Sequence, residues 1–167
     1  MSLMENRGNH KKKRLVLVKP PENSFFSFGG FSLAVLAAAV RHMSDVSILD
    51  CTTMTFEQAG QKIMALRPDI IGITLMGFSS LRNGVSLIRA ITAAVPAGEP
   101  VPAVITGGHG AFVFPEKILE AGSQCVVFGE GELTLQEILH SGIRPGMPGT
   151  IVLSGGKMVR GEPTKPI

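Results

Sequence analysis

Residues Val101 to Leu133 read VPAVITGGHGAFVFPEKILEAGSQCVVFGEGEL, and this stretch decides the fold class. It contains two short apolar runs, 103–106 and 124–128, and each leads directly into a glycine cluster, 107–110 or 129–131. A short apolar run bounded by glycine is typical of a buried strand. Because glycine has no side chain and tolerates positive φ, glycines at a strand end let the backbone approach a ligand closely. The stretch therefore predicts two strands that end at a ligand-binding edge.

The same alternation of strand and helix patterns extends outward on both sides of this stretch. Aliphatic runs predict further strands at 15–18, 46–50 and 70–75, and apolar residues at helical spacing predict helices at 31–43, 55–66, 81–95, 115–121 and 133–140. Helix 31–43 is apolar around most of its circumference, which predicts a well-buried helix. Together these patterns predict an α/β fold, a doubly wound five-stranded parallel sheet of the flavodoxin-like or Rossmann-like kind.

The two ends of the chain differ from the middle. Residues 1–14 are polar and basic, and we predict a disordered tail there. Residues 15–142 form the predicted α/β domain. Within 143–167, two strand-like runs flank Ser154-Gly155-Gly156, which is a hairpin signal. We therefore predict an appended β-hairpin, followed by the start of a linker to a further domain.

Composition narrows the classes of function. Five of the sixteen lysines and arginines lie within residues 7–14, so the folded part is close to neutral. The chain has no Trp or Tyr, and nucleic-acid binding through stacked aromatics is disfavoured. The two cysteines are far apart and form no metal-binding motif, which favours a reduced cytoplasmic setting. No apolar run reaches the length of a membrane span.

Candidate functional residues cluster in the two glycine turns. His109 stands alone, without a second ligand at metal spacing, so we interpret it as a hydrogen-bonding loop residue. Glu132 is predicted to cap the last helix, where a carboxylate favours the helix dipole, and Glu130 is the better candidate for a ligand contact. We predict no catalytic residue and no metal ligand.

Nucleotide-binding motifs are missing. The loop after the first strand has neither the GxGxxG of dinucleotide folds nor the GxxxxGK of phosphate loops. Asp50 ends the second predicted strand, where it could bind a ribose or cap a turn. The ligand is therefore not identified by a phosphate motif.

An ordered series of short motifs resembles the cobalamin-binding domain that precedes the catalytic barrel in many radical S-adenosylmethionine enzymes. The resemblance covers roughly Leu15 to the end of the chain. The motifs are Lys19-Pro20-Pro21, Leu33-Ala34-Leu36-Ala37, Pro68 to Thr74, Gly107-Gly108-His109, Pro115-Glu116, and Val127 to Glu132. The family includes methyltransferases and proteins like the anaerobic magnesium-protoporphyrin ester cyclase.

The resemblance implies a binding site for cobalamin, vitamin B12, with the corrin ring on the carboxyl ends of the strands and the nucleotide tail beside the glycine turns. Gly107 and Gly108 match the glycine pair that lets the tail pass, so replacing Gly108 with Val should block it. Thr74 and Met76 stand where other cobalamin domains carry Ser-x-Leu. The implied cofactor-binding residues are Phe26, Ser27, Phe28, Gly29, Thr74, Met76, Phe78, Ser79, Gly107, Gly108, His109, Phe128, Gly129, Glu130 and Gly131.

One departure from the wider cobalamin-binding group is informative. Mutases and methionine synthases carry a D-x-H-x-x-G motif after the first strand, whose histidine ligates cobalt. Here Phe26 stands at that position, so no histidine lower ligand is expected. Radical S-adenosylmethionine relatives commonly lack this histidine too, and the departure favours that branch.

The resemblance implies a module that presents cobalamin, or methylcobalamin, to a C-terminal radical S-adenosylmethionine barrel of the same parent chain. That barrel would hold S-adenosylmethionine and a 4Fe-4S cluster for methyl transfer or oxidative cyclisation. The present chain has no CxxxCxxC motif and is not catalytic alone. The alternative is a stand-alone flavodoxin-like domain that binds another ligand or a protein partner without cobalamin.

Overall fold

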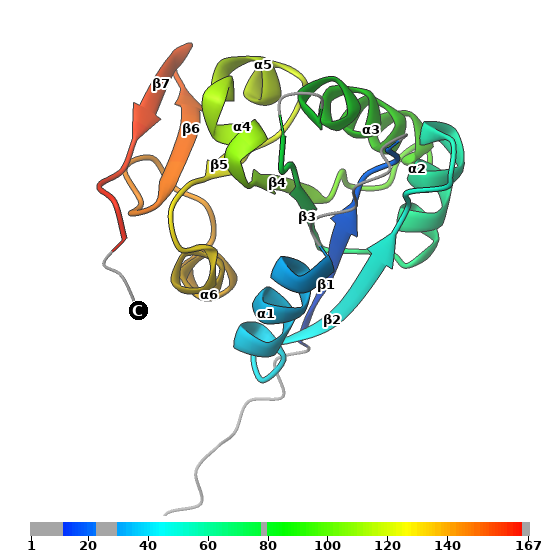
Figure 1. The fold of residues 1–167 in the computed structure, drawn as a ribbon, viewed down its shortest axis with the longest axis horizontal. Coiled ribbons are helices and arrows are strands. Elements are labelled where there is room, and N and C mark those ends of the chain that lie inside the picture. Colours follow the sequence, from blue (N-terminus) through cyan, green and yellow to red (C-terminus); the bar gives the residue numbers. More distant parts are fainter. Residues whose placement is uncertain (1–11, 23–29, 78–79, 165–167) are drawn as a thin grey trace, which may run out of the picture.

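The computed structural model describes residues 12–22, 30–77 and 80–164 (Figure 1). Seven strands form one sheet in the order β2-β1-β3-β4-β5-β6-β7. The strands are β1 Lys13–Lys19, β2 Ser44–Asp50, β3 Ile70–Thr74, β4 Ala103–Gly107, β5 Cys125–Val127, β6 Thr150–Ser154 and β7 Lys157–Arg160. The helices are α1 Gly30–Val40, α2 Phe56–Ala65, α3 Ser80–Ala94, α4 His109–Val113, α5 Pro115–Glu120 and α6 Gly131–Ser141.

The first five strands are parallel. From β1 the sheet grows to one side with β2 and to the other side with β3, β4 and β5, so the strand order switches between β1 and β3. This is the doubly wound arrangement predicted from the alternating pattern, and ligands of such sheets bind outside the carboxyl ends of the strands. The prediction of an α/β doubly wound sheet is confirmed. None of the helices in the described ranges is long and apolar enough to cross a membrane.

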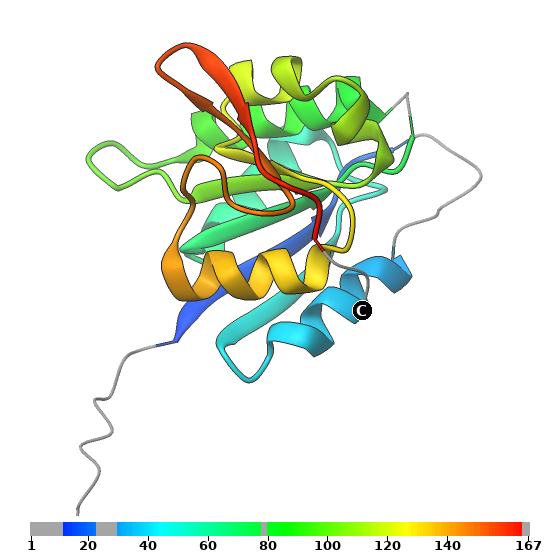
Figure 2. The ribbon, with the colours of Figure 1, turned by 90° about the vertical axis from the view of Figure 1, so that its left-hand side faces the viewer.

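Two hydrophobic cores fill the two faces of the sheet. One core joins the strands to α2, α3, α4 and α5, and the other joins them to α1 and α6. Figures 1 and 2 show α1 and α6 together on one side of the sheet and the other helices on the opposite side. The face covered by only two helices is the one that carries the candidate site.

Helix α2 shows how local sequence determines an element. Thr55 is its N-cap and accepts a hydrogen bond from the Gln58 backbone N–H at 3.2 Å, while the Gln58 side chain accepts one from the Thr55 N–H at 3.0 Å. This capping box fixes the start of the helix. A Cβ at Gly60 would lie 2.7 Å from the Ala90 carbonyl oxygen, so glycine allows α2 and α3 to pack closely.

Some elements differ from the sequence-based expectation. Strand β1 begins at Lys13, because the Arg14 backbone N–H donates to the Asp69 carboxylate at 2.7 Å and the Arg14 carbonyl accepts from the Asp69 N–H at 2.9 Å. The hairpin is not an appendage, because β6 pairs antiparallel with β5 and extends the main sheet. The division of the chain into three regions stays a prediction.

Helix α1 is predicted to be well buried, and this is wrong. Only Leu33 and Val40 are buried in it, and Phe31 is 83% exposed. The physical reason is its position: α1 covers the edge strand β2 and β1 on one side, and a cavity separates it from the sheet centre. The apolar residues around this helix therefore face the sheet, the cavity or solvent, depending on their position.

Candidate functional site

The carboxyl ends of the parallel strands meet in one row. Thr74 pairs with Gly107, and Gly107 pairs with Val127. The Leu75 N–H donates to the Gly107 carbonyl at 2.8 Å, which ties the end of β3 to the end of β4. This register brings the ends of β3, β4 and β5 to one edge of the sheet, as expected for the predicted parallel strands.

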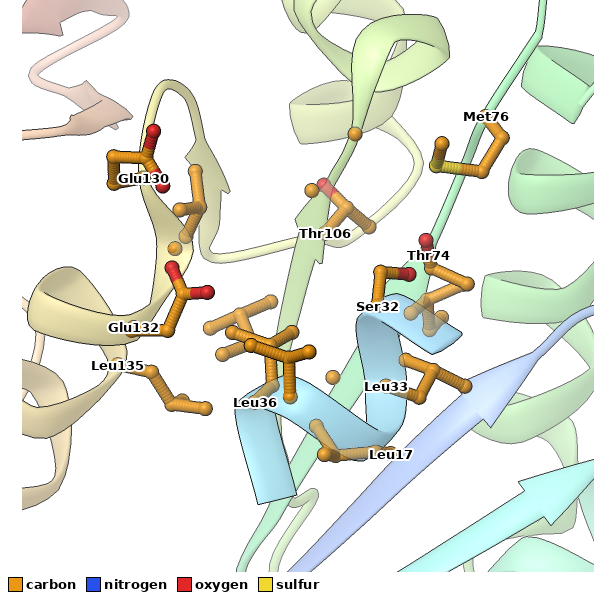
Figure 3. A pocket seen from close by; sticks show the side chains of 18 of the residues that line it. Leu17, Ser32, Leu33, Leu36, Thr74, Met76, Thr106, Glu130, Glu132 and Leu135 are labelled. Atoms are coloured by element: carbon orange, nitrogen blue, oxygen red, sulfur yellow. The ribbon is translucent and has the colours of Figure 1, made fainter. Parts of the chain in front are cut away.

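A cavity of about 400 Å³ opens at this row and runs between α1 and α6, which we call the α1–α6 cavity. Figure 3 shows its walls: Leu33 and Leu36 project from α1, Leu135 projects from α6, and Leu17 lies at the inner end. The inner walls are aliphatic, while Thr74, Glu130 and Glu132 lie toward the opening. An apolar interior with a few polar groups at the mouth is the usual make-up of a small-molecule site.

Gly72 creates the space at the bottom of the cavity. It lies in the middle of β3, between Leu17 on β1 and Ile105 on β4, and all three residues line the cavity. A Cβ at Gly72 would lie 2.8 Å from Leu17 Cδ2, so any side chain there would push Leu17 aside or enter the cavity. The glycine keeps the floor open where aliphatic side chains would otherwise meet.

The glycines after β4 have different roles. A Cβ at Gly107 would meet only Val127, at 3.6 Å, so the position tolerates a side chain at the cavity wall. Gly108 has φ +95°, and its Cβ would lie 2.5 Å from the Leu75 carbonyl oxygen. Gly110 donates its N–H to that same oxygen at 2.8 Å. Gly108 and Gly110 therefore allow the start of α4 to pack against the backbone after β3.

A Gly108→Val change is expected from the sequence to block the path of the nucleotide tail, but the structure shows a different effect. The new side chain would strike the backbone at Leu75 before it could occupy the path of a ligand tail. His109 likewise is not in a loop: it begins α4 and lines the cavity at its exposed end. The short α4 is not predicted from the sequence, because five residues are too few to show a helical period.

The structure brings most of the predicted cofactor-binding residues together. Those that line the α1–α6 cavity are Thr74, Met76, Gly107, Gly108, His109, Gly129, Glu130 and Gly131. Phe128 is buried behind them and stacks with Phe112, the ring centroids being 5.7 Å apart. Phe26, Ser27, Phe28, Gly29, Phe78 and Ser79 lie outside the described residues.

The structure places the two glutamates at the start of α6, and only the predicted capping residue differs. Glu130, not Glu132, is the N-cap residue of α6, and its side chain makes no capping hydrogen bond. Glu132 lies in the first turn, where its charge still favours the helix dipole, and it lines the cavity as Glu130 does. Both carboxylates are therefore placed to meet polar groups of a ligand at the mouth.

The inner wall of the cavity is not evident from the sequence. Its residues are Leu17, Ser32, Leu33, Val35, Leu36, Gly72, Ile105, Val127 and Leu135. Most look like ordinary core residues in the sequence. The available signal was Gly72, because a glycine inside an otherwise aliphatic strand often marks a close ligand approach.

A charged pair lies beside the cavity row. The Lys19 Nζ lies 4.0 Å from Asp50 Oδ2, with the lysine side chain 3% exposed and the aspartate side chain 64% exposed. Hydrogen bonds from Thr52, and to a lesser extent the Lys19 charge, hold the pKa of Asp50 below its usual value, against a smaller opposing effect of burial. Asp50 thus acts as a turn cap that also pairs with Lys19.

The cysteines are buried and free. Burial raises the pKa of Cys51 to about 11 and that of Cys125 to about 12. Both thiols are therefore protonated and unreactive in the native fold. Within the ranges that the structure describes, no three His, Cys, Asp or Glu side chains gather where they could hold a metal ion.

Several solved structures share the fold of this chain. The radical S-adenosylmethionine methyltransferase TsrM from Kitasatospora setae, solved with tryptophan substrate and a SAM analogue, superposes with a TM-score of 0.72 at 23% identity, covering 90% of this chain and 30% of that chain. The cobalamin-dependent S-adenosylmethionine radical enzyme OxsB, solved with aqua-cobalamin and S-adenosylmethionine, gives 0.74 at 18% identity, covering 92% and 22%. A cobalamin-binding protein from Desulfitobacterium hafniense DCB-2 gives 0.57 at 16%, covering 75% and 59%.

These similarities establish the fold, and the chain spans less than a third of the two enzymes. No curated protein sequence matches the chain. The model of the B12 binding domain family, in contrast, matches residues 27–139. That range includes β2 to β5, the glycine turns and most of α6, so it takes in most of the cavity. The chain belongs to the B12 binding domain family.

Proposed function

We propose that the chain is the cobalamin-binding module of a larger radical S-adenosylmethionine enzyme, and that it holds the nucleotide tail of cobalamin in the α1–α6 cavity. The observation that carries the proposal is the cavity itself, which opens at the carboxyl ends of β3, β4 and β5. Ligands of doubly wound sheets bind at this edge.

The shape of the site fits the proposed ligand. About 400 Å³ is too little space for a whole corrinoid, but it suits one planar arm inserted between α1 and α6. The corrin ring would rest on the rim formed by Thr74, Gly107 and Gly129, where small residues permit a flat group to approach. Exposed Met76 and Phe31 would add apolar contacts at the same rim.

The chain's own contribution is binding and orientation. Methylcobalamin, when bound, would supply a transferable methyl group. The aliphatic walls would exclude water from the tail, and Glu130 and Glu132 would accept hydrogen bonds from amide groups of the ring. The two cysteines cannot hold an iron–sulfur cluster with the CxxxCxxC spacing, so radical chemistry would belong to another domain, with its own S-adenosylmethionine and 4Fe-4S cluster.

We further propose that residues 15–142 form the cofactor domain, that the hairpin in 143–167 adds two strands to its sheet, and that 143–167 lead toward the catalytic domain. The path of the chain supports this. The Glu162 carbonyl accepts from the Gly149 N–H at 2.8 Å, and Thr164 lies against Gly129 at the cavity rim. The chain up to Thr164 thus returns to the rim where the cofactor would lie.

The proposal is tested by mixing the purified chain with hydroxocobalamin and separating bound from free corrinoid by gel filtration. We expect the visible absorption of the corrinoid to travel with the protein. If micromolar protein retains no corrinoid, cobalamin binding by this chain is contradicted.

The coordination of cobalt needs a separate measurement. We propose that no protein histidine is its lower ligand; Phe26, which stands at the histidine position, lies outside the described residues. After reduction to cobalt(II), the electron paramagnetic resonance spectrum should lack nitrogen splitting from an imidazole ligand. A nitrogen-split spectrum that disappears in His109→Ala would show that His109 ligates cobalt and would overturn this part of the proposal.

A further inference from the structure

Lys19 is a buried cation at the ligand edge of the sheet. Its side chain is only 3% exposed, and a buried charge normally needs close partners. Within the described ranges, its ionic partner is Asp50 at 4.0 Å, which is the outer limit of an ion pair. The ammonium group has three hydrogens to donate, and the Asp50 carboxylate at 4.0 Å is beyond hydrogen-bond distance.

The pairing register puts Lys19 in the same row as the cavity mouth. Lys19 pairs with Asp50 on one side, and the Val18–Ile73 pair places Lys19 next to Thr74 on the other. Side chains alternate along a strand, so Lys19 faces the same side of the sheet as Leu17. Leu17 and Thr74 both line the cavity. Lys19 does not itself line the cavity, but the register puts it beside Thr74 at the same end of the sheet, on the β2 side.

We propose that Lys19 anchors the ligand by donating a hydrogen bond to the phosphodiester of the nucleotide tail of cobalamin. This inference rests on the proposed function. In the proposed arrangement the corrin ring lies on the rim and the base of the tail lies in the cavity. The phosphate joins these two groups, so it would lie near the strand ends, at the height of Thr74. It is the anionic group of the tail, and hydrogen bonds between a buried ammonium and an anion are stronger than those between neutral groups.

Asp50 then has a defined part. In the free protein it partly neutralises Lys19 from the solvent side, with its own position held by the Thr52 N–H at 2.9 Å. At 4.0 Å the carboxylate is too far away for a hydrogen bond to the ammonium, so a ligand anion can compete as an acceptor. Lys19 is thus a binding residue for the cofactor, and Asp50 is a positioning residue.

The test compares two corrinoids, cobalamin and cobinamide, which lacks the phosphate and the nucleotide. Lys19→Met keeps the length and apolar stem of the side chain but removes its charge. Lys19→Arg keeps the charge, and Lys157→Met removes an exposed charge on β7 as a matched control. Dissociation constants are measured by the change in visible absorption, and folding is monitored by circular dichroism.

We expect Lys19→Met to weaken cobalamin binding by about tenfold or more, with little change for cobinamide. Lys19→Arg should retain most of the affinity, and Lys157→Met should match the wild type. An equal loss for both corrinoids would overturn the phosphate assignment in favour of a corrin amide. Unchanged cobalamin binding would refute the contact altogether. If the wild type binds neither corrinoid, the proposed function fails as well.

A second variant keeps the inference testable if Lys19→Met does not fold. Asp50→Asn leaves the ammonium in place without its counter-charge, so an anionic ligand should become more important for stability. We expect cobalamin to raise the melting temperature of Asp50→Asn by more than it raises that of the wild type. Cobinamide should shift both proteins equally, and an equal shift with cobalamin would contradict the proposal.

Discussion

Replacing Gly72 with Val would fill the floor of the α1–α6 cavity from within the sheet. The first atom of the new side chain would lie 2.8 Å from Leu17 Cδ2 and 3.8 Å from Ile105 Cγ1. Leu17 is a flexible side chain, so it can move by a few tenths of an ångström, and the remaining methyl groups must then project into the cavity. The change therefore removes ligand space without touching the backbone of the rim.

The expected magnitudes separate binding from stability. Burying two additional methyl groups contributes about 1.5 kcal/mol, and displacing Leu17 costs about 1–3 kcal/mol, so the free energy of unfolding should change by less than about 2 kcal/mol. A planar base that buries about 150 Å² gains about 4 kcal/mol. Loss of even half of this gain weakens binding by more than about tenfold.

The assay is the dissociation constant of hydroxocobalamin for the two proteins, measured beside their urea unfolding curves. Gly84→Val is the matched control, because a Cβ at Gly84 would lie 2.7 Å from a Leu75 methyl group on the opposite face of the sheet. We expect Gly84→Val to alter the free energy of unfolding but to leave the affinity for hydroxocobalamin within about threefold of the wild type. If Gly72→Val binds cobalamin as tightly as the wild type, the cavity is not the seat of the tail and the reasoning is refuted.

Other predictions concern the framework around the site. Gly161→Ala would place a Cβ 1.9 Å from the Met147 carbonyl oxygen, so we expect a loss of about 3 kcal/mol or more in urea unfolding, and a loss below about 1 kcal/mol would contradict the packing described. Because burial raises the pKa of Cys51 and Cys125 to about 11 and about 12, the unfolded chain loses thiol protons at lower pH than the native one. Native stability should therefore be complete below about pH 8.5 and decline above it, and native thiols should resist Ellman's reagent at pH 8; rapid labelling without unfolding would be inconsistent with this burial. The Arg160 guanidinium lies 4.5 Å from the centroid of the Phe128 ring and 5.2 Å from that of the Phe112 ring. Arg160→Ala should therefore lower the melting temperature by an amount that corresponds to about 1 kcal/mol, and Arg160→Lys should lower it less. An unchanged melting temperature would show that the stacking contributes nothing.

The fold is largely predictable because the strands are short aliphatic runs separated by well-marked helices. Ile70 to Thr74 has all five residues buried, as expected for a strand covered on both faces, and the Thr55 capping box marks the start of its helix. The row of turns follows from topology alone, since parallel strands end at one edge. The strand pattern is therefore sufficient to group Thr74, Gly107 and Gly129 at one site.

The interior of the site cannot be predicted in the same way. Leu17, Leu33 and Leu135 are aliphatic residues that look like core, and only the structure shows that they surround a space. Sequence patterns show which positions are apolar, but they do not show how far apart two helices lie. For the same reason, the apolar character of α1 predicts full burial, although much of that surface faces the cavity and solvent.

The shallow attachment of α1 has a consequence for motion. Only two of its side chains, Leu33 and Val40, are fully buried, while Leu36, Ala37 and Ala39 pack against the core partly buried. The Gln136 side-chain amide on α6 donates a hydrogen bond to the Ala39 carbonyl at 3.0 Å. Local opening of such a helix costs far less than global unfolding, so its amide hydrogens should exchange with solvent well before those of β3. We therefore expect α1, which forms the front wall of the cavity, to open locally more often than the sheet behind it. A bulky ligand would then enter without rearrangement of the strands, and its dissociation rate would follow the opening rate of this helix.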